Sequence, residues 1–156
     1  MALATHNLKM IPKYEISFAA HTDVPRLIEI ATKYANDYGE QYDPIYLNCH
    51  FHDIISDQNS VILTSVEAKP QLIITGFIAI TLVMYPTSNE KQAYKLHWIV
   101  DKDFPSRGTA LLKAGEHWAK LHGAKKYVVS IRDKAAELLM SRQKFNLKSF
   151  NYEKSL

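Results

Sequence analysis

One stretch of the sequence, residues 96–112, limits the fold more than any other. Its first part, Leu96–Val100, has the composition of a β-strand, and a helical pattern begins at Gly108 after a short turn. A helix that starts so soon after a strand presents unpaired N–H groups and a partial positive charge at the junction. Such a junction can hold a phosphate, and the small residues Gly108 and Ala110 let the backbone approach it closely. We therefore predict a strand–turn–helix unit able to bind an anion.

The turn by itself supports two interpretations. Arg107 and Thr109 could add hydrogen-bond donors to a phosphate bound at the helix start. Short glycine motifs also occur by chance, and the same residues would then form a plain connection between a strand and a helix. Only residues elsewhere in the chain can favour one of these interpretations.

Hydrophobic periodicity along the chain predicts an α/β fold. The expected order is β-α-α-β-β-β-α-β-α-β, with strands at 14–19, 60–67, 72–85, 93–100, 126–131 and 146–154 and helices at 24–38, 44–55, 108–122 and 134–144. Hairpins would pair the strands of the first half, whereas the strand–helix–strand crossovers of the second half imply parallel neighbours. The result is a mixed sheet with helices on both faces. Gly76, inside the third predicted strand, indicates a bulge or a close approach of two backbones.

Length and charge narrow the classes of function. A chain of 156 residues fits one domain, which we place over residues 1–156 with 1–13 as a loosely ordered lead-in. The net charge of +3 is small and the basic residues are dispersed, which argues against nucleic-acid binding. The longest apolar run, Phe77–Tyr85, is too short to span a membrane. A single cysteine, Cys49, excludes an internal disulfide, suits a cytoplasmic protein and is expected to be a small buried thiol.

The residues around the helix start resemble the acyl-CoA motif of the GCN5-related N-acetyltransferase (GNAT) superfamily. That motif is Gln/Arg-x-x-Gly-x-Gly/Ala and follows a strand valine by eight residues, and Val100, Gly108 and Ala110 stand at the matching positions. Three further landmarks occur in the family's order: a first strand, Asp-Val-Pro turn and helix in 16–31, a Gly-Phe pair in 74–78, and a late strand-and-helix segment in 129–145. The compact length and divergent motifs also resemble the short acetyltransferase-like proteins found in phage genomes.

The sequence departs from the family's pattern at chemically important positions. Pro105 stands at the first motif position and has no N–H to offer a phosphate. In the late segment, Asp133 replaces the usual Asn, Met140 replaces a Tyr and Lys144 replaces a Gly. In many members of the family that Tyr is the acid that reprotonates the CoA thiolate, and a Met cannot donate a proton. Binding of the cofactor and catalysis are therefore separate hypotheses.

The resemblance implies a direct reaction in which an amine attacks the thioester of acetyl-CoA. A base removes the amine proton, a backbone N–H stabilises the oxyanion, and an acid protonates the leaving thiolate. It also implies that the strand, the turn and the start of the late helix hold acetyl-CoA. The residues expected at this cofactor site are Trp98, Ile99, Val100, Ser106, Arg107, Gly108, Thr109, Ala110, Leu111 and Asp133.

Three residues are candidates for proton transfer. Alternate residues of a strand share a face, and in the family the acceptor face would carry positions 94, 96 and 98, which favours Tyr94 with Trp98 shaping the pocket. His97 has the better pKa for a base near neutral pH, but it points to the other face unless a bulge shifts the register. Tyr152, on the predicted closing strand, could replace the missing acid. Each could instead be an ordinary packing residue.

The resemblance also implies that the second predicted helix lines the acceptor site, where Tyr46 and His50 are expected to touch the substrate. His50, His52 and Asp53 also lie close together, but their spacing does not place ligands at i and i+4, so we expect no metal. The leading hypothesis is an acetyl-CoA-dependent N-acetyltransferase acting on a primary amine of a small molecule or a protein. The alternative is a fold of this family that has lost catalysis and serves as a CoA-binding or protein-interaction module. A homodimer is possible in either case.

Overall fold

The computed structural model describes residues 13–156, so the lead-in predicted over 1–13 lies almost wholly outside the described residues. A sheet of five strands forms its centre, in the order β1-β2-β3-β4-β5. The strands are β1 (Tyr14–Phe18), β2 (Ser60–Glu67), β3 (Ile73–Tyr85), β4 (Glu90–Val100) and β5 (Lys126–Val128). Neighbours are antiparallel from β1 to β4, and β5 joins β4 in parallel, as the crossover predicted.

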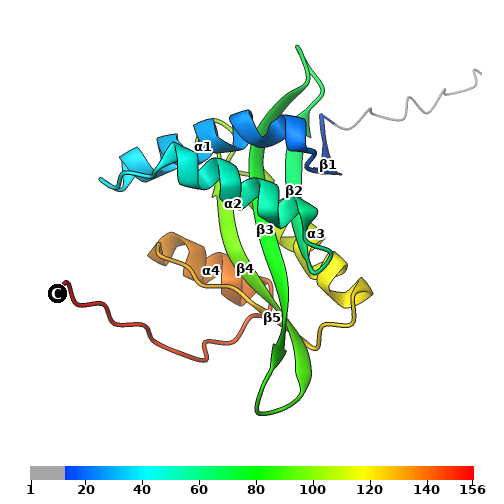
Figure 1. Ribbon diagram of the computed structural model, residues 1–156, viewed down its shortest axis with the longest axis vertical. Coiled ribbons are helices and arrows are strands. Elements are labelled where there is room, and N and C mark those ends of the chain that lie inside the picture. Colours follow the sequence, from blue (N-terminus) through cyan, green and yellow to red (C-terminus); the bar gives the residue numbers. More distant parts are fainter. Residues whose placement is uncertain (1–12) are drawn as a thin grey trace, which may run out of the picture.

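Helices cover both faces of this sheet, as expected (Figure 1). The helices are α1 (Val24–Asp37), α2 (Pro44–Ser56), α3 (Arg107–Leu121) and α4 (Lys134–Arg142), with a short 3₁₀ turn, η1 (His21–Asp23), before α1. The α1 and α2 helices pack side by side on one face, over a cluster that includes Phe51, Phe77 and Ile99. The α3 and α4 helices pack on the other face, in a cluster that includes Ile78 and Ile80 of β3 and Leu111 of α3. Because β3 is buried on both faces, it is the centre of the fold.

Local sequence signals explain where the first two helices begin and end. The Asp43 carboxylate accepts hydrogen bonds from the N–H groups of Ile45 (2.9 Å) and Tyr46 (3.3 Å), which caps α2 just before Pro44 in its first turn. The α1 helix ends at Gly39, whose φ of +69° is the left-handed conformation that glycine adopts most readily. Fixing these ends holds α1 and α2 as adjacent helices over one face of the sheet.

Two irregularities bend the central strands. The register between β2 and β3 shifts near Gly76, where an added Cβ would lie only 3.0 Å from the Ile99 carbonyl oxygen on β4. The close backbone approach predicted from this glycine is thus confirmed. A second shift lies between β3 and β4, where Ile80 pairs with Lys95 and Ala79 pairs with His97. Leu96 is therefore an extra residue in β4, a β-bulge that reverses the alternation of side chains beyond it.

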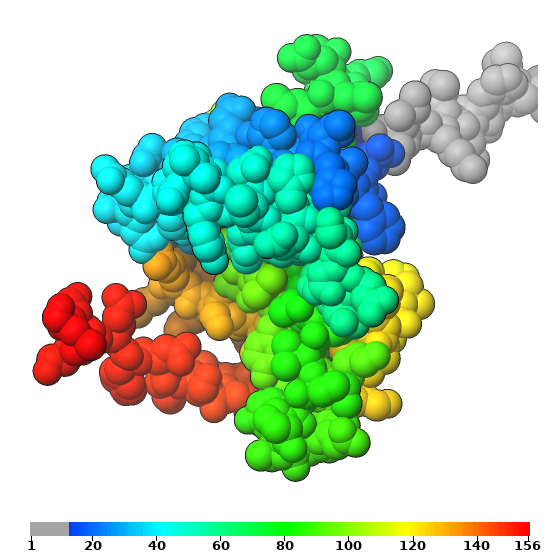
Figure 2. Space-filling view, viewed as in Figure 1, coloured from blue at the N-terminus to red at the C-terminus, as the bar shows by residue number. Residues whose placement is uncertain are grey.

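The predictions of a closing strand at 146–154 and of a buried Cys49 are wrong. Residues 146–154 form no strand: the chain after α4 is extended coil, and Figure 2 shows it standing out from the body of the molecule. Alternating polar and apolar residues make a strand only where a sheet edge accepts their hydrogen bonds, and β5 offers a paired length of three residues. Cys49 is exposed on α2 rather than buried, because the faces of α2 that pack inward carry Leu47, Phe51 and Ile54 instead.

Helix α3 approaches the sheet most closely at Gly115. A Cβ added there would lie 2.5 Å from both Ile80 Cδ1 and the Tyr127 hydroxyl, so Gly115→Ala must push α3 off the sheet or displace a buried ring. We expect a loss of about 1–3 kcal/mol in the free energy of unfolding, despite the better helix propensity of alanine. Gly108→Ala is the matched control, because its Cβ would make only ordinary contacts beginning at 3.5 Å. Thermal melts that show equal stability for the two variants would contradict this packing.

Candidate functional site

The bulge at Leu96 decides which side chains of β4 face α2. Before the bulge, Ala93 faces α3 and Tyr94 faces the opposite side. After it, Trp98 faces α3 and His97 faces α1 and α2. Tyr94 and His97 therefore share a face, and the expectation that Trp98 would share the face of Tyr94 is wrong. A bulge does shift the register, as the conditional prediction required, and it brings His97 to the face of Tyr94.

His97 meets His50 among aromatic rings between β4 and α2. The two Nε2 atoms are 2.9 Å apart, so one ring donates a hydrogen bond to the other. The His97 ring also makes edge contacts with Phe51 of α2, at a centroid distance of 5.5 Å, and His50 stacks on Tyr46 at 5.7 Å. The Tyr46 side chain is exposed. The pair thus runs from the partly buried strand to the surface of α2, and it joins a predicted catalytic residue to two predicted acceptor-site residues.

The surroundings keep both imidazoles neutral near pH 7. Burial, followed by the neighbouring His50 and Lys95, lowers the pKa of His97 to about 4. Burial also lowers the pKa of His50, although the carboxylate of Asp53 on the same helix opposes that change. Tyr94 differs in that its hydroxyl donates a hydrogen bond of 2.9 Å to Gln92 Oε1, so its proton is already engaged.

The outer edge of β4 is open next to this pair. Strand β5 pairs with β4 only from Gln92 to Tyr94, so within residues 13–156 the outer edge of Lys95–Val100 has no strand partner. Two contacts reach across the opening. Lys95 Nζ donates to the Ser130 carbonyl at 2.5 Å, and Arg132, in the segment before α4, pairs with Glu40 of the α1–α2 loop at 2.6 Å. Sequence patterns gave no signal for these contacts, since each joins segments far apart in the chain.

The open edge leads directly to the start of α3. Ser106 is the N-cap residue, but its side chain makes no capping hydrogen bond to the described helix; its Oγ accepts instead from Arg107 Nη1. Gly108 packs against Trp98, whose indole N–H donates to the Gly108 carbonyl at 3.1 Å. The backbone N–H groups of Arg107 and Gly108 bond to carbonyls of the preceding turn, at 3.1 and 3.3 Å. Trp98 therefore holds the first turn of α3 against β4.

The Arg107 side chain points away from the open edge. Its guanidinium donates to both oxygens of Glu67, at 2.6 and 3.2 Å, and lies 3.9 Å from the ring centre of Tyr14. Glu67 is only 5% exposed, so the ion pair neutralises a buried carboxylate. In this arrangement Arg107 ties the start of α3 to β1 and β2, and its guanidinium is not free to meet a phosphate.

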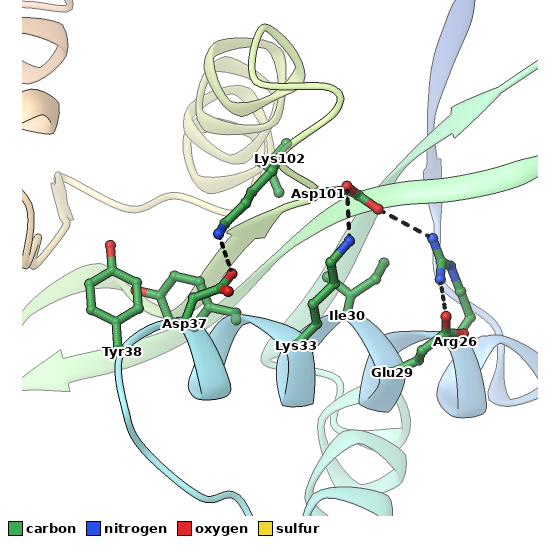
Figure 3. Close-up of a pocket in the computed structure, with 10 residues that line it drawn as sticks. Arg26, Glu29, Ile30, Lys33, Asp37, Tyr38, Asp101 and Lys102 are labelled. Carbon is green, nitrogen blue, oxygen red and sulfur yellow. Dashed lines mark ion pairs between the residues drawn. The ribbon is translucent and has the colours of Figure 1, made fainter.

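Two charged residues at the beginning of the β4–α3 turn, Asp101 and Lys102, face α1 (Figure 3). Asp101 lies 3.6 Å from Lys33 Nζ and 3.8 Å from Arg26 Nη2, and Lys102 pairs with Asp37 at 3.0 Å. These residues line a cavity of about 260 Å³ between α1 and the turn. The charges around the cavity are paired with one another, and these ion pairs hold the turn against α1.

The structure of the late segment shows what Asp133 and Met140 do in place of the family's usual residues. It also places Tyr152 apart from the other candidate residues. Asp133 caps α4, with its Oδ1 accepting from the Ala135 N–H at 2.9 Å, a role that Asn would fill equally well. Met140 is buried in the cluster beneath α3 and α4. Tyr152 is 94% exposed on the extended tail. The structure thus brings Tyr94, His97, Tyr46 and His50 to one side of β4, and Tyr152 lies outside that group.

Comparison with solved structures identifies the architecture. An acetyltransferase from Trypanosoma brucei superposes with a TM-score of 0.73 at 13% identity, covering 92% of this chain and 99% of its own. A GNAT family acetyltransferase from Staphylococcus aureus gives 0.69 at 16% identity, with 92% and 99% covered. The glucosamine-6-phosphate N-acetyltransferase from Arabidopsis thaliana gives 0.73 at 15% identity, with 91% and 97% covered. This chain has the GNAT fold. No protein-family model and no curated protein matches the sequence.

The described part of the GNAT-fold chain contains neither a metal cluster nor a membrane-spanning helix. Among the described residues, no three or more His, Cys, Asp or Glu side chains are grouped so that they could hold a metal ion. None of the helices in the described part of the chain combines the length and the apolar character needed to cross a membrane.

The low pKa of His97 predicts how stability depends on pH. The unfolded chain takes up a proton at His97 near the ordinary pKa of 6.5, whereas the folded protein accepts it only near 4. The contribution of His97 to stability is therefore fully present above pH 6.5 and is lost as the pH drops from 6.5 to 4. Melting temperatures measured across this window should fall less steeply in His97→Gln. An equal slope in His97→Gln and wild type would contradict the prediction, and His52→Gln serves as the control.

The Arg107–Glu67 ion pair predicts a large effect on stability. Arg107→Met leaves the buried Glu67 carboxylate without its partner and should lower the free energy of unfolding by about 3 kcal/mol. The double variant Arg107→Met/Glu67→Leu removes both charges and should recover most of that loss. Urea unfolding of the single and double variants measures both effects. A single variant as stable as the wild type would show that Glu67 is solvated without Arg107.

Proposed function

We propose that this chain is an acetyl-CoA-dependent N-acetyltransferase that moves an acetyl group to a primary amine of a small molecule or a protein. The observation that carries the proposal is the open edge of β4. It begins at the Leu96 bulge, beside the His97–His50 pair, and ends at the start of α3. An extended arm with amide groups can pair with such an edge as a further strand would. The solved GNAT-fold acetyltransferases support the same reaction class.

The residues present could bind an acyl-CoA through their backbone groups more than through their side chains. The start of α3 has no side-chain cap, and Ser106, Gly108, Thr109 and Ala110 are small enough to admit a phosphate. Trp98, Ile99 and Val100 would contribute their open backbone edge, and Leu111 packs beneath the helix start. Arg107 and Asp133 would contribute only through the backbone, because Glu67 and the Ala135 N–H engage their side chains. Acetyl-CoA supplies the thioester whose carbonyl carbon the amine attacks.

Among the candidate bases, the geometry favours His97. A neutral imidazole accepts a proton from an attacking amine, and His97 lies one residue beyond the bulge on the open strand. Tyr94 would contribute to the acceptor wall, since its hydroxyl is bonded to Gln92. Tyr46 and His50 would line the same wall from α2. Tyr152 could protonate the thiolate only if the tail folded back toward β4.

A CoA-binding or protein-interaction module without catalysis is the second candidate. It is favoured by the buried Met140, where many members of the family have an acid, and by the exposed position of Tyr152. It is also favoured by the contacts of Lys95 and Arg132, which span the opening that the thioester would have to enter.

Ligand-dependent melting tests the cofactor site, and an amine screen then separates the two candidates. Acetyl-CoA at about 100 times its Kd should stabilise the fold by about 2.7 kcal/mol, with a smaller effect from ATP. Gly108→Glu should abolish the shift, because a carboxylate at the helix start repels a phosphate. Release of free CoA in the presence of glucosamine 6-phosphate, spermidine or a lysine peptide would support the transferase. A melting shift without turnover would favour a CoA-binding module. No shift with millimolar acetyl-CoA would contradict the transferase and favour a protein-interaction module.

A further inference from the structure

We propose that His50 and His97 act as a two-imidazole proton relay, which carries the acceptor's proton from the open strand to the surface of α2. The inference deepens the proposed acetyl transfer and rests on it. It begins from the Nε2–Nε2 contact of 2.9 Å, which joins a residue of β4 to a residue of α2. This contact depends on the Leu96 bulge, without which His97 would face α3.

The contact fixes which nitrogen of each ring is left for other partners. His97 uses Nε2 toward His50, so only its Nδ1 can take a proton from an amine. His50 uses Nε2 toward His97, so only its Nδ1 can exchange with water. His50 stacks on the exposed ring of Tyr46, which places its end of the pair at the protein surface. The two rings therefore form a directed path from the strand outward.

The surroundings explain why a single imidazole would not be enough. Phe51 and Phe77 pack around His97, at ring distances of 5.5 and 6.3 Å, and no carboxylate of the described chain is paired with it. Lys95 on β4 is a cation near His97, whereas Asp53 on α2 lies near His50. A proton held on His97 would be an unpaired buried charge, but on His50 it would be partly solvated and near a carboxylate.

Every proton that the relay moves has a donor and an acceptor. As the amine nitrogen bonds to the thioester carbon, its proton passes to His97 Nδ1, the Nε2 proton of His97 passes to His50 Nε2, and the Nδ1 proton of His50 passes to water. The C–S bond then breaks and the sulfur leaves as a thiolate. The reverse transfer, from water through His50 to His97, delivers one proton to the thiolate and restores both starting tautomers. The pair would thus perform the acid step for which Met140 has no proton.

Substitution of His50 separates a relay from a merely structural hydrogen bond. His50→Gln keeps a donor and an acceptor but cannot pass a proton through, so kcat should fall by about a hundredfold while the KM for acetyl-CoA stays unchanged. His50→Ala leaves a space that imidazole added to the buffer can fill, and its kcat should rise with imidazole concentration. The matched control is His52, two residues along α2, which contacts His21 instead. His52→Gln should keep wild-type kcat, and His52→Ala should not respond to imidazole.

These rates are measured with whichever primary amine of the screen turns over fastest. The ¹⁵N-histidine NMR spectrum of the same proteins is recorded as a second measurement. A wild-type kcat in His50→Gln, or a folded His50→Ala that ignores imidazole, would overturn the relay alone. The NMR spectrum should show coupling between the two Nε2 nuclei, and its absence would overturn the contact on which the relay rests. Coupling together with no turnover of any amine by the wild-type protein would overturn the proposed function, and the relay with it.

Discussion

The one-residue bulge at Leu96 is the constraint on which the rest of the site depends. Because side chains alternate along a strand, one extra residue moves every later side chain of β4 to the opposite face. His97 turns toward Phe51 and His50, and Trp98 turns toward α3, where its indole holds the carbonyl of Gly108. A single irregularity in the pairing of β3 with β4 therefore builds both the imidazole pair and the fixed start of α3.

Ion pairs around the β4–α3 turn stabilise this arrangement. Arg107 is drawn toward Glu67 on β2, and Asp101 toward Arg26 and Lys33 on α1. Each pair satisfies a carboxylate that is largely withdrawn from water, which unpaired would be costly. Together they hold the turn between β2 on one side and α1 on the other. The side chain that the motif suggested as a phosphate ligand is thus part of the framework that holds the motif.

Much of this fold was predictable from local signals. The caps at Asp43 and Gly39, the period of α1 and the crossover that makes β5 parallel to β4 are all properties of short stretches of sequence. The tail was predicted wrongly because its alternation is as regular as that of a real strand, and only a free partner edge distinguishes the two. Cys49 was misplaced for a related reason, since the inward faces of α2 are defined by what α2 packs against.

The sequence by itself determined the order of the elements as far as α4, the position of the turn before α3 and the residues from which a site could be made. Only the tertiary structure decided which of those residues meet. His97 could be assigned to a face only once the register of β4 against β3 was known, and its partner His50 lies 47 residues away on a helix that the sheet positions. Propensity and periodicity act over a few neighbouring residues, whereas a register shift and a contact between a strand and a helix depend on how distant segments share one core.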